Sequence, residues 1–224
     1  MTSISITSLA RPFKWTHEYL NEVLCKSKDK LLLNKDLQKA FNEVDRADFV
    51  PPELLDLAYR DQDVDIGWHE KLDKPTTIAL MLQLMDVKKG GRYLDIGTGT
   101  GYVAALLATA VGKRGQVISI ERKQFLLEIA RINLAKYPFV KNLTLQLGDG
   151  SEGYKQLAPY DGIHISASYE EIPEVVKGQL KIKGKLIAPI GTDQLMVLHR
   201  LSPSTYKETL HKSFFFAKIG SGIE

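Results

Sequence analysis

Apolar residues from position 93 onward follow two alternating patterns along the chain. Short runs in which every second residue is apolar predict strands, and longer runs with apolar residues three or four positions apart predict helices. Strands that are separated by helices form a parallel sheet with helices on both faces. The pattern therefore predicts an α/β fold with strands at 93–97, 116–121, 143–148, 161–166 and 185–190 and helices at 101–111, 123–136 and 171–180.

The end of the chain has a different pattern. Residues 194–201 and 206–218 are both strand-like, and the short segment 202–204 joins them without a helix. An antiparallel hairpin is the simplest arrangement for two such strands. We therefore expect a seven-stranded, mostly parallel sheet, and we assign the aromatic run 214–216 to its last strand, with one or two rings buried.

Apolar residues in the first part of the chain have helical spacing. Asn34 is a suitable N-cap for a helix that places Leu37 and Phe41 on one face. The pair Pro51-Pro52 is typical of a helix start and predicts a second helix at 53–59. These helices precede the sheet, so we expect them to form an N-terminal helical cap.

The segment 61–75 carries little secondary-structure pattern and leads into a predicted helix at 76–85. A long polar connector between a cap and a sheet is a candidate binding loop. We expect one domain in which the cap and this loop occupy 1–75, the core of the sheet occupies 76–191 and the antiparallel strands occupy 192–224.

Composition narrows the class of protein. The net charge is only +3 and the lysines are spread along the chain, which disfavours a nucleic-acid-binding face. The single Cys25 excludes an intramolecular disulfide and a cysteine-only zinc site, and no run reaches the roughly 20 apolar residues of a membrane span. His17, His199 and His211 lack metal-site spacing, so we assign no metal. We expect a cytoplasmic monomer that binds neither nucleic acid nor membranes.

Three glycines lie between a predicted strand and a predicted helix. Gly97, Gly99 and Gly101 allow a ligand to approach bare backbone, because glycine has no Cβ and tolerates positive φ. A dinucleotide-binding loop would have its third glycine at position 102, where this chain has Tyr102. The carboxylate of Asp95 would repel a pyrophosphate, but it suits a ligand that carries an ammonium and a sulfonium. S-adenosylmethionine is such a ligand.

Two further acidic residues end predicted strands. Glu121 ends the strand 116–121 and is placed to accept hydrogen bonds from both ribose hydroxyls. Asp149, between Gly148 and Gly150, could accept the adenine amino group; alternatively it only forms a turn. Because parallel strands end at the same edge of a sheet, these groups are expected to converge on one nucleoside.

Several segments together resemble the protein-L-isoaspartate O-methyltransferase family over roughly residues 35–220. The stretch AFNEVDRADFVP at 40–51 is similar to the family's N-terminal signature. The other matching segments follow in the family's order and spacing at 57–61, 66–67, 94–102, 120–122, 148–150 and 158–164. The N-terminal match makes the resemblance specific, since the later segments are partly general to methyltransferases.

The resemblance implies a class I methyltransferase (Rossmann-like) fold with one reversed strand near the sheet's end. It implies S-adenosylmethionine as cofactor and methylation of the free carboxylate of isoaspartyl residues in damaged proteins, which starts repair through a succinimide. Isoaspartyl-containing proteins or peptides would be the partners. The implied cofactor-binding residues are Asp95, Gly97, Thr98, Gly99, Gly101, Glu121, Arg122, Asp149 and Gly150.

The substrate loop departs from the family pattern. That pattern is approximately Ile-Gly-x-Gly-Gln-Thr-Ile-Ser-Gln-Pro, and the matching residues 66–75 read IGWHEKLDKP. Glu70 replaces glutamine, Lys71 replaces threonine and Asp73 replaces the functional serine. The resemblance assigns catalytic roles to Asp73 and Thr76, and substrate contacts to His69, Lys71, Leu72, Thr77 and His164.

The charge at position 73 leaves the acceptor open. Two like charges about 4 Å apart repel by roughly 4 kcal/mol at an effective dielectric near 20, which disfavours an isoaspartyl carboxylate facing an ionised Asp73. Lys71 or Lys74 could neutralise Asp73, burial could protonate it, or Thr76 and Thr77 could supply hydroxyls.

Other interpretations stay open as well. Asp73, with His69 or His164, could act as a base or acceptor toward a different substrate. The chain could also be a non-catalytic cofactor-binding protein. The 69–74 segment could be a solvated loop, and Trp68 could be a packing residue rather than a stacking platform for a peptide. His164 could be a hydrogen-bonded core residue.

Overall fold

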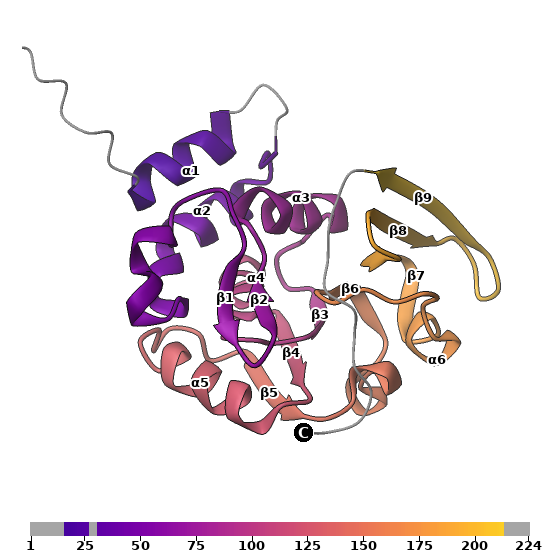
Figure 1. The fold of residues 1–224 in the computed structure, drawn as a ribbon. Coiled ribbons are helices and arrows are strands. Elements are labelled where there is room, and N and C mark those ends of the chain that lie inside the picture. Colours follow the sequence, from indigo (N-terminus) through magenta and orange to yellow (C-terminus); the bar gives the residue numbers. More distant parts are fainter. Residues whose placement is uncertain (1–15, 27–30, 213–224) are drawn as a thin grey trace, which may run out of the picture.

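The computed structural model describes residues 16–26 and 31–212, and a seven-stranded sheet organises most of them (Figure 1). The strand order is β5-β4-β3-β6-β7-β8-β9, and the five strands from β5 to β7 are parallel. From the central β3 the chain runs to β4 and β5 on one side, and it then returns to β6 on the other side of β3. Such a reversal leaves a crevice at the carboxyl ends of the strands. The strands are β3 (Arg92–Ile96), β4 (Gln116–Glu121), β5 (Leu143–Leu147), β6 (Tyr160–Ile165), β7 (Leu180–Ile190), β8 (Gln194–Arg200) and β9 (Tyr206–Lys212).

The predicted C-terminal hairpin is confirmed. Strand β8 pairs antiparallel with β7 and with β9, so β8 is the one reversed strand of the sheet. The part of the predicted last strand beyond residue 212, including the aromatic run 214–216, lies outside the described residues.

The two faces of the sheet are covered by helices of different length. One hydrophobic cluster joins a face of the sheet to α2 (Lys35–Glu43), α3 (Pro75–Met85), α4 (Tyr102–Val111) and α5 (Gln124–Leu134). The other cluster packs against η4 (Lys155–Leu157) and α6 (Glu174–Lys177), near η3 (Gly150–Glu152). The prediction of a helix over 171–180 was therefore wrong in length. Pro173 disfavours helical geometry in the residue before it, and Gly178 follows the last helical residue.

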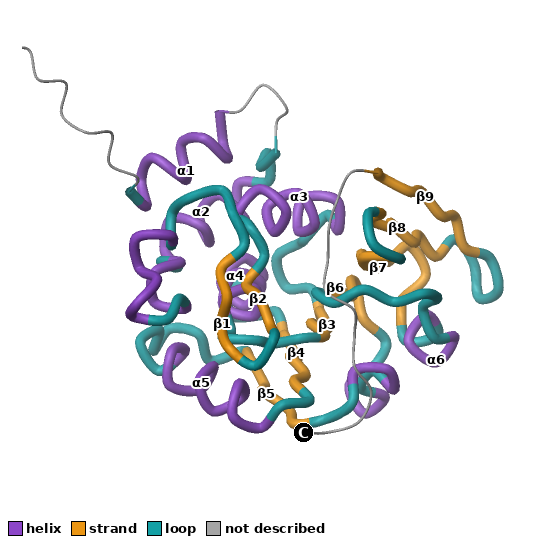
Figure 2. The backbone as a smooth tube through the Cα atoms, in the orientation of Figure 1, coloured by secondary structure: helices purple, strands orange, loops and turns teal. Residues whose placement is uncertain are grey.

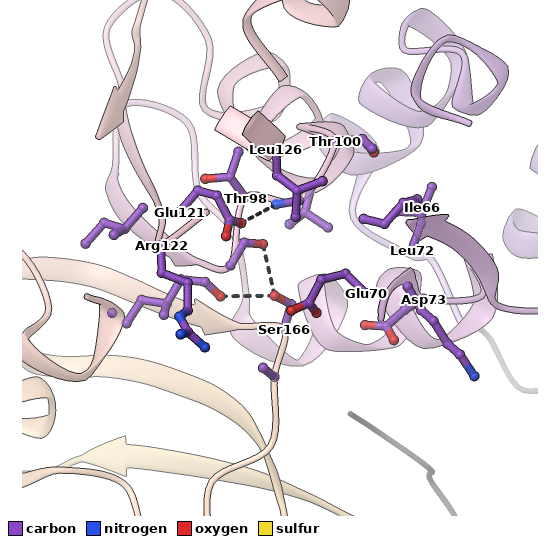
Figure 3. Close-up of a pocket in the computed structure, with 18 of the residues that line it drawn as sticks. Ile66, Glu70, Leu72, Asp73, Thr98, Thr100, Glu121, Arg122, Leu126 and Ser166 are labelled. Atoms are coloured by element: carbon purple, nitrogen blue, oxygen red, sulfur yellow. Dashed lines mark hydrogen bonds between the residues drawn. The ribbon is translucent and has the colours of Figure 1, made fainter. Parts of the chain in front are cut away.

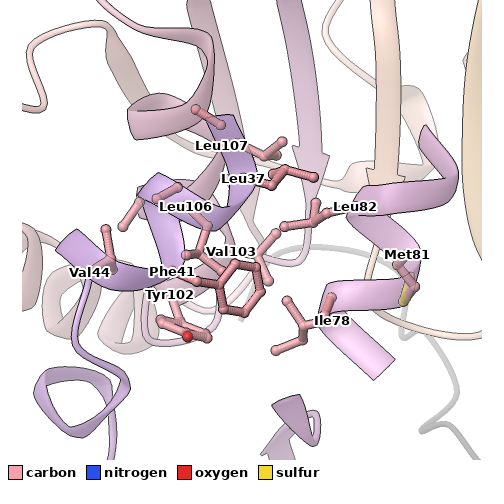
Figure 4. Close-up of a cluster of buried hydrophobic side chains, with 14 of the residues drawn as sticks. Leu37, Phe41, Val44, Ile78, Met81, Leu82, Tyr102, Val103, Leu106 and Leu107 are labelled. Atoms are coloured by element: carbon pink, nitrogen blue, oxygen red, sulfur yellow. The ribbon is translucent and has the colours of Figure 1, made fainter. Parts of the chain in front are cut away.

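The N-terminal cap shares its core with the helices of the sheet. It contains α1 (His17–Lys26), α2, and the two 3₁₀ helices η1 (Arg46–Phe49) and η2 (Pro52–Leu57), the last where an α-helix at 53–59 was predicted. Asn34 caps α2 as expected, because its side chain accepts hydrogen bonds from the backbone N–H groups of Asp36 and Leu37. Phe41 is fully buried among Ile78, Leu82, Tyr102 and Val103 (Figure 4).

The segment expected to be a loop at 61–75 contains an antiparallel hairpin. Strand β1 (Val64–Gly67) pairs with β2 (Glu70–Leu72), and the backbone runs from the cap through this hairpin into α3 (Figure 2). The turn residues Trp68 and His69 both have positive φ, 54° and 64°, as a two-residue hairpin turn of type I′ requires. Asn-Gly is the usual sequence for that turn, so Trp-His did not indicate a hairpin. Among the described residues, no helix is long and apolar enough to cross a membrane.

Candidate active site

The glycine loop between β3 and α4 has the backbone geometry that its sequence predicts. The φ angles of Gly97, Gly99 and Gly101 are 95°, 53° and 98°, which side-chain-bearing residues rarely adopt. A Cβ at Gly97 would also collide with the hydroxyl of Ser166 at the end of β6. The loop therefore presents bare backbone at the carboxyl ends of the central strands.

A cavity of about 280 Å³ lies between this loop and the β1–β2 hairpin (Figure 3). Glu121 and Arg122 line it from the end of β4, and Asp73 lines it from the far side, just after β2. The cavity thus joins the predicted nucleoside site to the predicted substrate loop. Its other lining residues include Asp63, Ile66, Glu70, Lys71, Leu72, Ile96, Gly97, Thr98, Gly99, Thr100, Gly150 and Ser166.

Glu121 is held in place by backbone N–H groups. Its two carboxylate oxygens accept hydrogen bonds from Gly99, at 2.8 Å, and from Lys123, at 3.0 Å. Burial raises the pKa of Glu121, and the hydrogen bonds from Lys123 and Gly99 oppose that rise. The carboxylate retains acceptor capacity toward the cavity, which is what a ribose diol needs.

Asp95 lies beneath the glycine loop instead of in the cavity lining. The residue is fully buried, and its carboxylate accepts a 2.6 Å hydrogen bond from the Ser119 hydroxyl and lies 2.8 Å from His164 Nδ1. The hydroxyls of Ser119 and Thr98 are 2.7 Å apart. The network connects β3, β4 and β6 to the loop, so Asp95 supports the loop from below. Asp95 is not among the residues that line the cavity, and its assignment to the cofactor stays a prediction.

Asp149, which was expected at the adenine, and the cofactor-binding candidate Gly150 lie on either side of the cavity wall. Gly150 lines the cavity, whereas Asp149 lines a neighbouring hollow. Asp149 also caps η3, because its side chain accepts a 2.9 Å hydrogen bond from the backbone of Ser151. This contact is the turn-forming role that was the alternative interpretation of Asp149.

Asp73 is the unpaired carboxylate of the cavity. It makes no hydrogen bond or ion pair with any residue in the described part of the chain, so its oxygens are open to a ligand. Burial raises the pKa of Asp73 to about 7, and the charge of Asp63 adds to that rise. His164, Arg46 and Lys74 act in the opposite direction without cancelling it.

Gly101 of the predicted cofactor-binding residues does not line the cavity, and neither do four residues assigned to catalysis or substrate contacts. The Thr76 hydroxyl donates to the Asp61 carboxylate at 2.8 Å, and Thr77 is buried within α3. His69 is exposed at the hairpin tip, and His164 is buried against Asp95. Only Lys71, Leu72 and Asp73 of the residues assigned to substrate or catalysis therefore face the cavity.

The tip of the hairpin is fixed to the start of α5. The Lys123 ammonium, which is almost completely buried, lies 3.0 Å from the Glu70 carboxylate and donates a 2.9 Å hydrogen bond to the Trp68 carbonyl. The Trp68 ring packs on Phe125, with ring centroids 3.9 Å apart, although 51% of Trp68 remains exposed. Ile66 lies against the glycine loop near Gly99. The hairpin is therefore docked over the loop and forms one wall of the cavity.

Sequence reasoning missed several residues around the cavity. Asp63, Ile66 and Ser166 line it, and the buried Arg46 contacts the Leu72 carbonyl next to Asp73. Their roles depend on the hairpin pairing and on the register of β6, which no local motif shows. Within the described ranges, no group of three or more His, Cys, Asp or Glu side chains could hold a metal ion.

Sequence comparisons indicate one family. The sequence model of protein-L-isoaspartate(D-aspartate) O-methyltransferase matches residues 18–221. A protein-L-isoaspartate O-methyltransferase of Archaeoglobus fulgidus is 43% identical over 175 residues, which cover 77% of this chain and 81% of that protein. One of Methanococcus aeolicus is 39% identical over 191 residues, which cover 84% and 88%.

Solved structures agree with the sequence comparison. A structure of a protein-L-isoaspartate O-methyltransferase matches with a TM-score of 0.82 and 28% identity, covering 93% of this chain and 67% of that one. A second, from Plasmodium falciparum and described as the same enzyme in complex with S-adenosyl-L-homocysteine, matches with a TM-score of 0.80 and 25% identity, covering 91% and 98%. The chain therefore belongs to the protein-L-isoaspartate(D-aspartate) O-methyltransferase family, a family of class I methyltransferases that use S-adenosylmethionine.

Proposed function

We propose that this chain methylates the free carboxylate of L-isoaspartyl residues in damaged proteins, with S-adenosylmethionine as the methyl donor. The observation that carries the proposal is the single cavity that joins the glycine loop and Glu121 to the hairpin residue Asp73. Family membership supplies the acceptor class, and the cavity supplies a place where donor and acceptor can meet.

The residues present fit an adenosylated cofactor. The backbone of the glycine loop can be approached closely, and at Gly97 and Gly150 a side chain would collide with Ser166 or Ile96. Glu121 offers a carboxylate to the ribose hydroxyls. When bound, the cofactor supplies a methyl group activated by its sulfonium.

The acceptor needs little chemical help from the protein. An isoaspartyl carboxylate is already an anionic nucleophile, so the site needs alignment and local electrostatics more than a general base. Lys71 at the cavity contributes positive charge for an anionic acceptor. Asp73 lines the same cavity, where it could contact the substrate carboxylate directly.

The test is transfer of a tritiated methyl group to an isoaspartyl peptide and to its normal aspartyl twin. We expect transfer to the isoaspartyl peptide only. A protein that binds S-adenosylhomocysteine in calorimetry but methylates neither peptide would remove this function and leave a cofactor-binding protein without transfer activity.

A different acceptor is the second candidate function, and the unpaired carboxylate of Asp73 is the observation that favours it. Toward an amine or hydroxyl, an ionised Asp73 would serve as base or orienting acceptor. The substitution Asp73→Ser separates the two candidates. A gain of isoaspartyl activity supports the repair function with an altered loop, whereas loss of a native activity found in cell extract supports a changed acceptor.

We further propose that the chain folds as one domain and acts as a monomer in the cytoplasm. Phe41 of the cap lies in the same hydrophobic cluster as Val103 beside the sheet, which favours one cooperative unit. Cys25 is partly buried, and burial raises the pKa of its thiol, which suits an unreactive cysteine in a reducing compartment. Light scattering and a single unfolding transition would test the first two points.

A further inference from the structure

Two carboxylates close the base of the β1–β2 hairpin and face the cavity together. Val64 and Leu72 are paired across the hairpin. Asp63 precedes Val64 and Asp73 follows Leu72, so both residues lie at the open end of the hairpin. Both line the cavity. The backbone N–H of Lys74 donates a 2.9 Å hydrogen bond to Asp63, which fixes that carboxylate beside the segment that carries Asp73.

The two buried basic residues near Asp73 do not pair with it. Arg46 is completely buried, but its guanidinium makes a 3.4 Å contact with the Leu72 carbonyl and lies over the Tyr102 ring, and its Nε and Nη1 have no partner among the described residues. His164 is held by Asp95 through Nδ1, and its Nε2 is likewise without a described partner. Neither residue comes within ion-pair distance of Asp73.

We propose that Asp73 contacts the isoaspartyl carboxylate as a neutral carboxylic acid that donates a hydrogen bond, and that Asp63 is a positioning residue that keeps the proton on it. The inference rests on the proposed function and specifies the protonation state of Asp73 in its acceptor site. A protonated Asp73 presents an O–H where the family pattern has the hydroxyl of serine, whereas an ionised Asp73 would weaken carboxylate binding roughly a thousandfold by repulsion.

The electrostatic surroundings favour the proton on Asp73. Asp73 is partly buried, which disfavours the charged form first, and Asp63 disfavours it further, so the pKa of Asp73 is raised to about 7. Asp63 is itself exposed, so its share of the effect is reduced by solvent. The charged or titratable groups around Asp73 are Asp63 and Lys74 beside the hairpin, Arg46 from η1, His164 from β6, and Glu70, Lys71, Glu121 and Arg122 of the cavity lining.

The proposal requires a specific pH dependence. The substrate carboxylate must be ionised, which needs a pH above about 4. Asp73 must be protonated, and its carboxyl loses the proton as the pH rises through its pKa of about 7. Activity at limiting substrate should therefore fall above pH 7 and be about fiftyfold lower at pH 9 than at pH 7.

The experiment measures S-adenosylhomocysteine formed with an isoaspartyl peptide from pH 5 to pH 9. This product is the right readout, because the methyl ester itself is lost as a succinimide at alkaline pH. We compare the unaltered chain with Asp73→Asn, whose amide still donates but does not titrate, and with Asp63→Asn. Asp56→Asn is the matched control, since Asp56 pairs with Arg60 on the surface and does not line the cavity.

The unaltered chain and the Asp56→Asn control should show the fall of kcat/KM above pH 7. The kcat/KM of Asp73→Asn, relative to its own value at pH 7, should not show that fall up to pH 9, and Asp63→Asn should lower the midpoint by about half a pH unit. Circular dichroism at each pH shows that the variants are folded.

A flat profile for the unaltered chain above pH 7, or the same alkaline fall in Asp73→Asn, would overturn the inference. Failure of the proposed function itself looks different. In that case no S-adenosylhomocysteine is formed with the peptide at any pH, although the protein still binds it.

Discussion

Replacing Lys123 by methionine should loosen the β1–β2 hairpin over the cavity and accelerate release of S-adenosylhomocysteine. The Lys123 ammonium connects the start of α5 to the hairpin through the Glu70 carboxylate and the Trp68 carbonyl. Methionine keeps much of the apolar stem and removes the charge and the donors. Glu70 stands where the family pattern has glutamine, so an ionic contact of this kind depends on the altered loop of this chain.

The size of the effect follows from burial. The side chain of Lys123 is 9% exposed and that of Glu70 is 35% exposed. A hydrogen bond to a charged group contributes about 1.5–3 kcal/mol, and the partial exposure of Glu70 favours the lower half of that range. Loss of about 1.5–2 kcal/mol raises the population of the undocked hairpin roughly 10–30-fold. If the product leaves through the undocked state, its dissociation rate should rise by a similar factor.

Stopped-flow chase of bound S-adenosylhomocysteine measures that rate, and the fluorescence of Trp68 against Phe125 provides a signal at the hairpin itself. Glu70→Gln isolates the ionic contact, because it removes the charge and leaves an acceptor for Lys123. Lys39→Met is the control, since it breaks an exposed pair with Glu43 on α2. Unchanged dissociation in both Lys123→Met and Glu70→Gln would refute the reasoning, as would equal acceleration in the control.

Three further predictions concern stability. Asp73→Asn should stabilise the fold at pH 8 by at most about 4 kcal/mol and have little effect near pH 4. The reason is that the folded state raises the pKa of Asp73 from 3.8 to about 7, so the unaltered fold loses stability as the pH rises between those values. Urea unfolding at both pH values checks this. Gly97→Ala should lower the free energy of unfolding by about 1–3 kcal/mol and weaken cofactor binding, since the new Cβ meets Ser166. Gly90 has a similar φ, but a Cβ there meets no atom, so Gly90→Ala should cost less. Thermal melting measures the stability of the two variants, and calorimetry measures their cofactor binding. Phe41→Ala should cost about 3–5 kcal/mol and lower Tm by roughly 10 °C, and a drop under 2 °C would show that the cap is not part of the main core.

The sheet and its main helices could be predicted from the sequence because their signals are local. The apolar spacing that predicts strands β3 and β4 and helices α3 and α4 is visible within short stretches of sequence. The glycines of the loop likewise indicate positive φ angles at their own positions. The short α6 is an exception among the helices. Its pattern continued past Pro173 and Gly178, but the backbone restrictions of those two residues determined its length.

The hairpin escaped prediction because its strands are short and its turn lacks glycine or asparagine at Trp68 and His69. Because the hairpin was not predicted, the position of Asp63 relative to Asp73 was not predicted either. Once β1 pairs with β2, Asp63 lies across from Asp73, and no periodicity in the sequence relates the two. The pairing also places Glu70 at Lys123, more than fifty residues further along the chain.

The sequence by itself determined the methyl donor, because a glycine loop followed by Glu121 at the next strand end describes a nucleoside site through short-range spacing alone. Only the tertiary structure decided the protonation of Asp73 at the acceptor end of the cavity. The proton affinity of Asp73 depends on burial and on charges contributed by Arg46, Asp63 and His164. Those residues come from a 3₁₀ helix, a hairpin and a central strand, and long-range electrostatics cannot be known until the fold sets the distances between them.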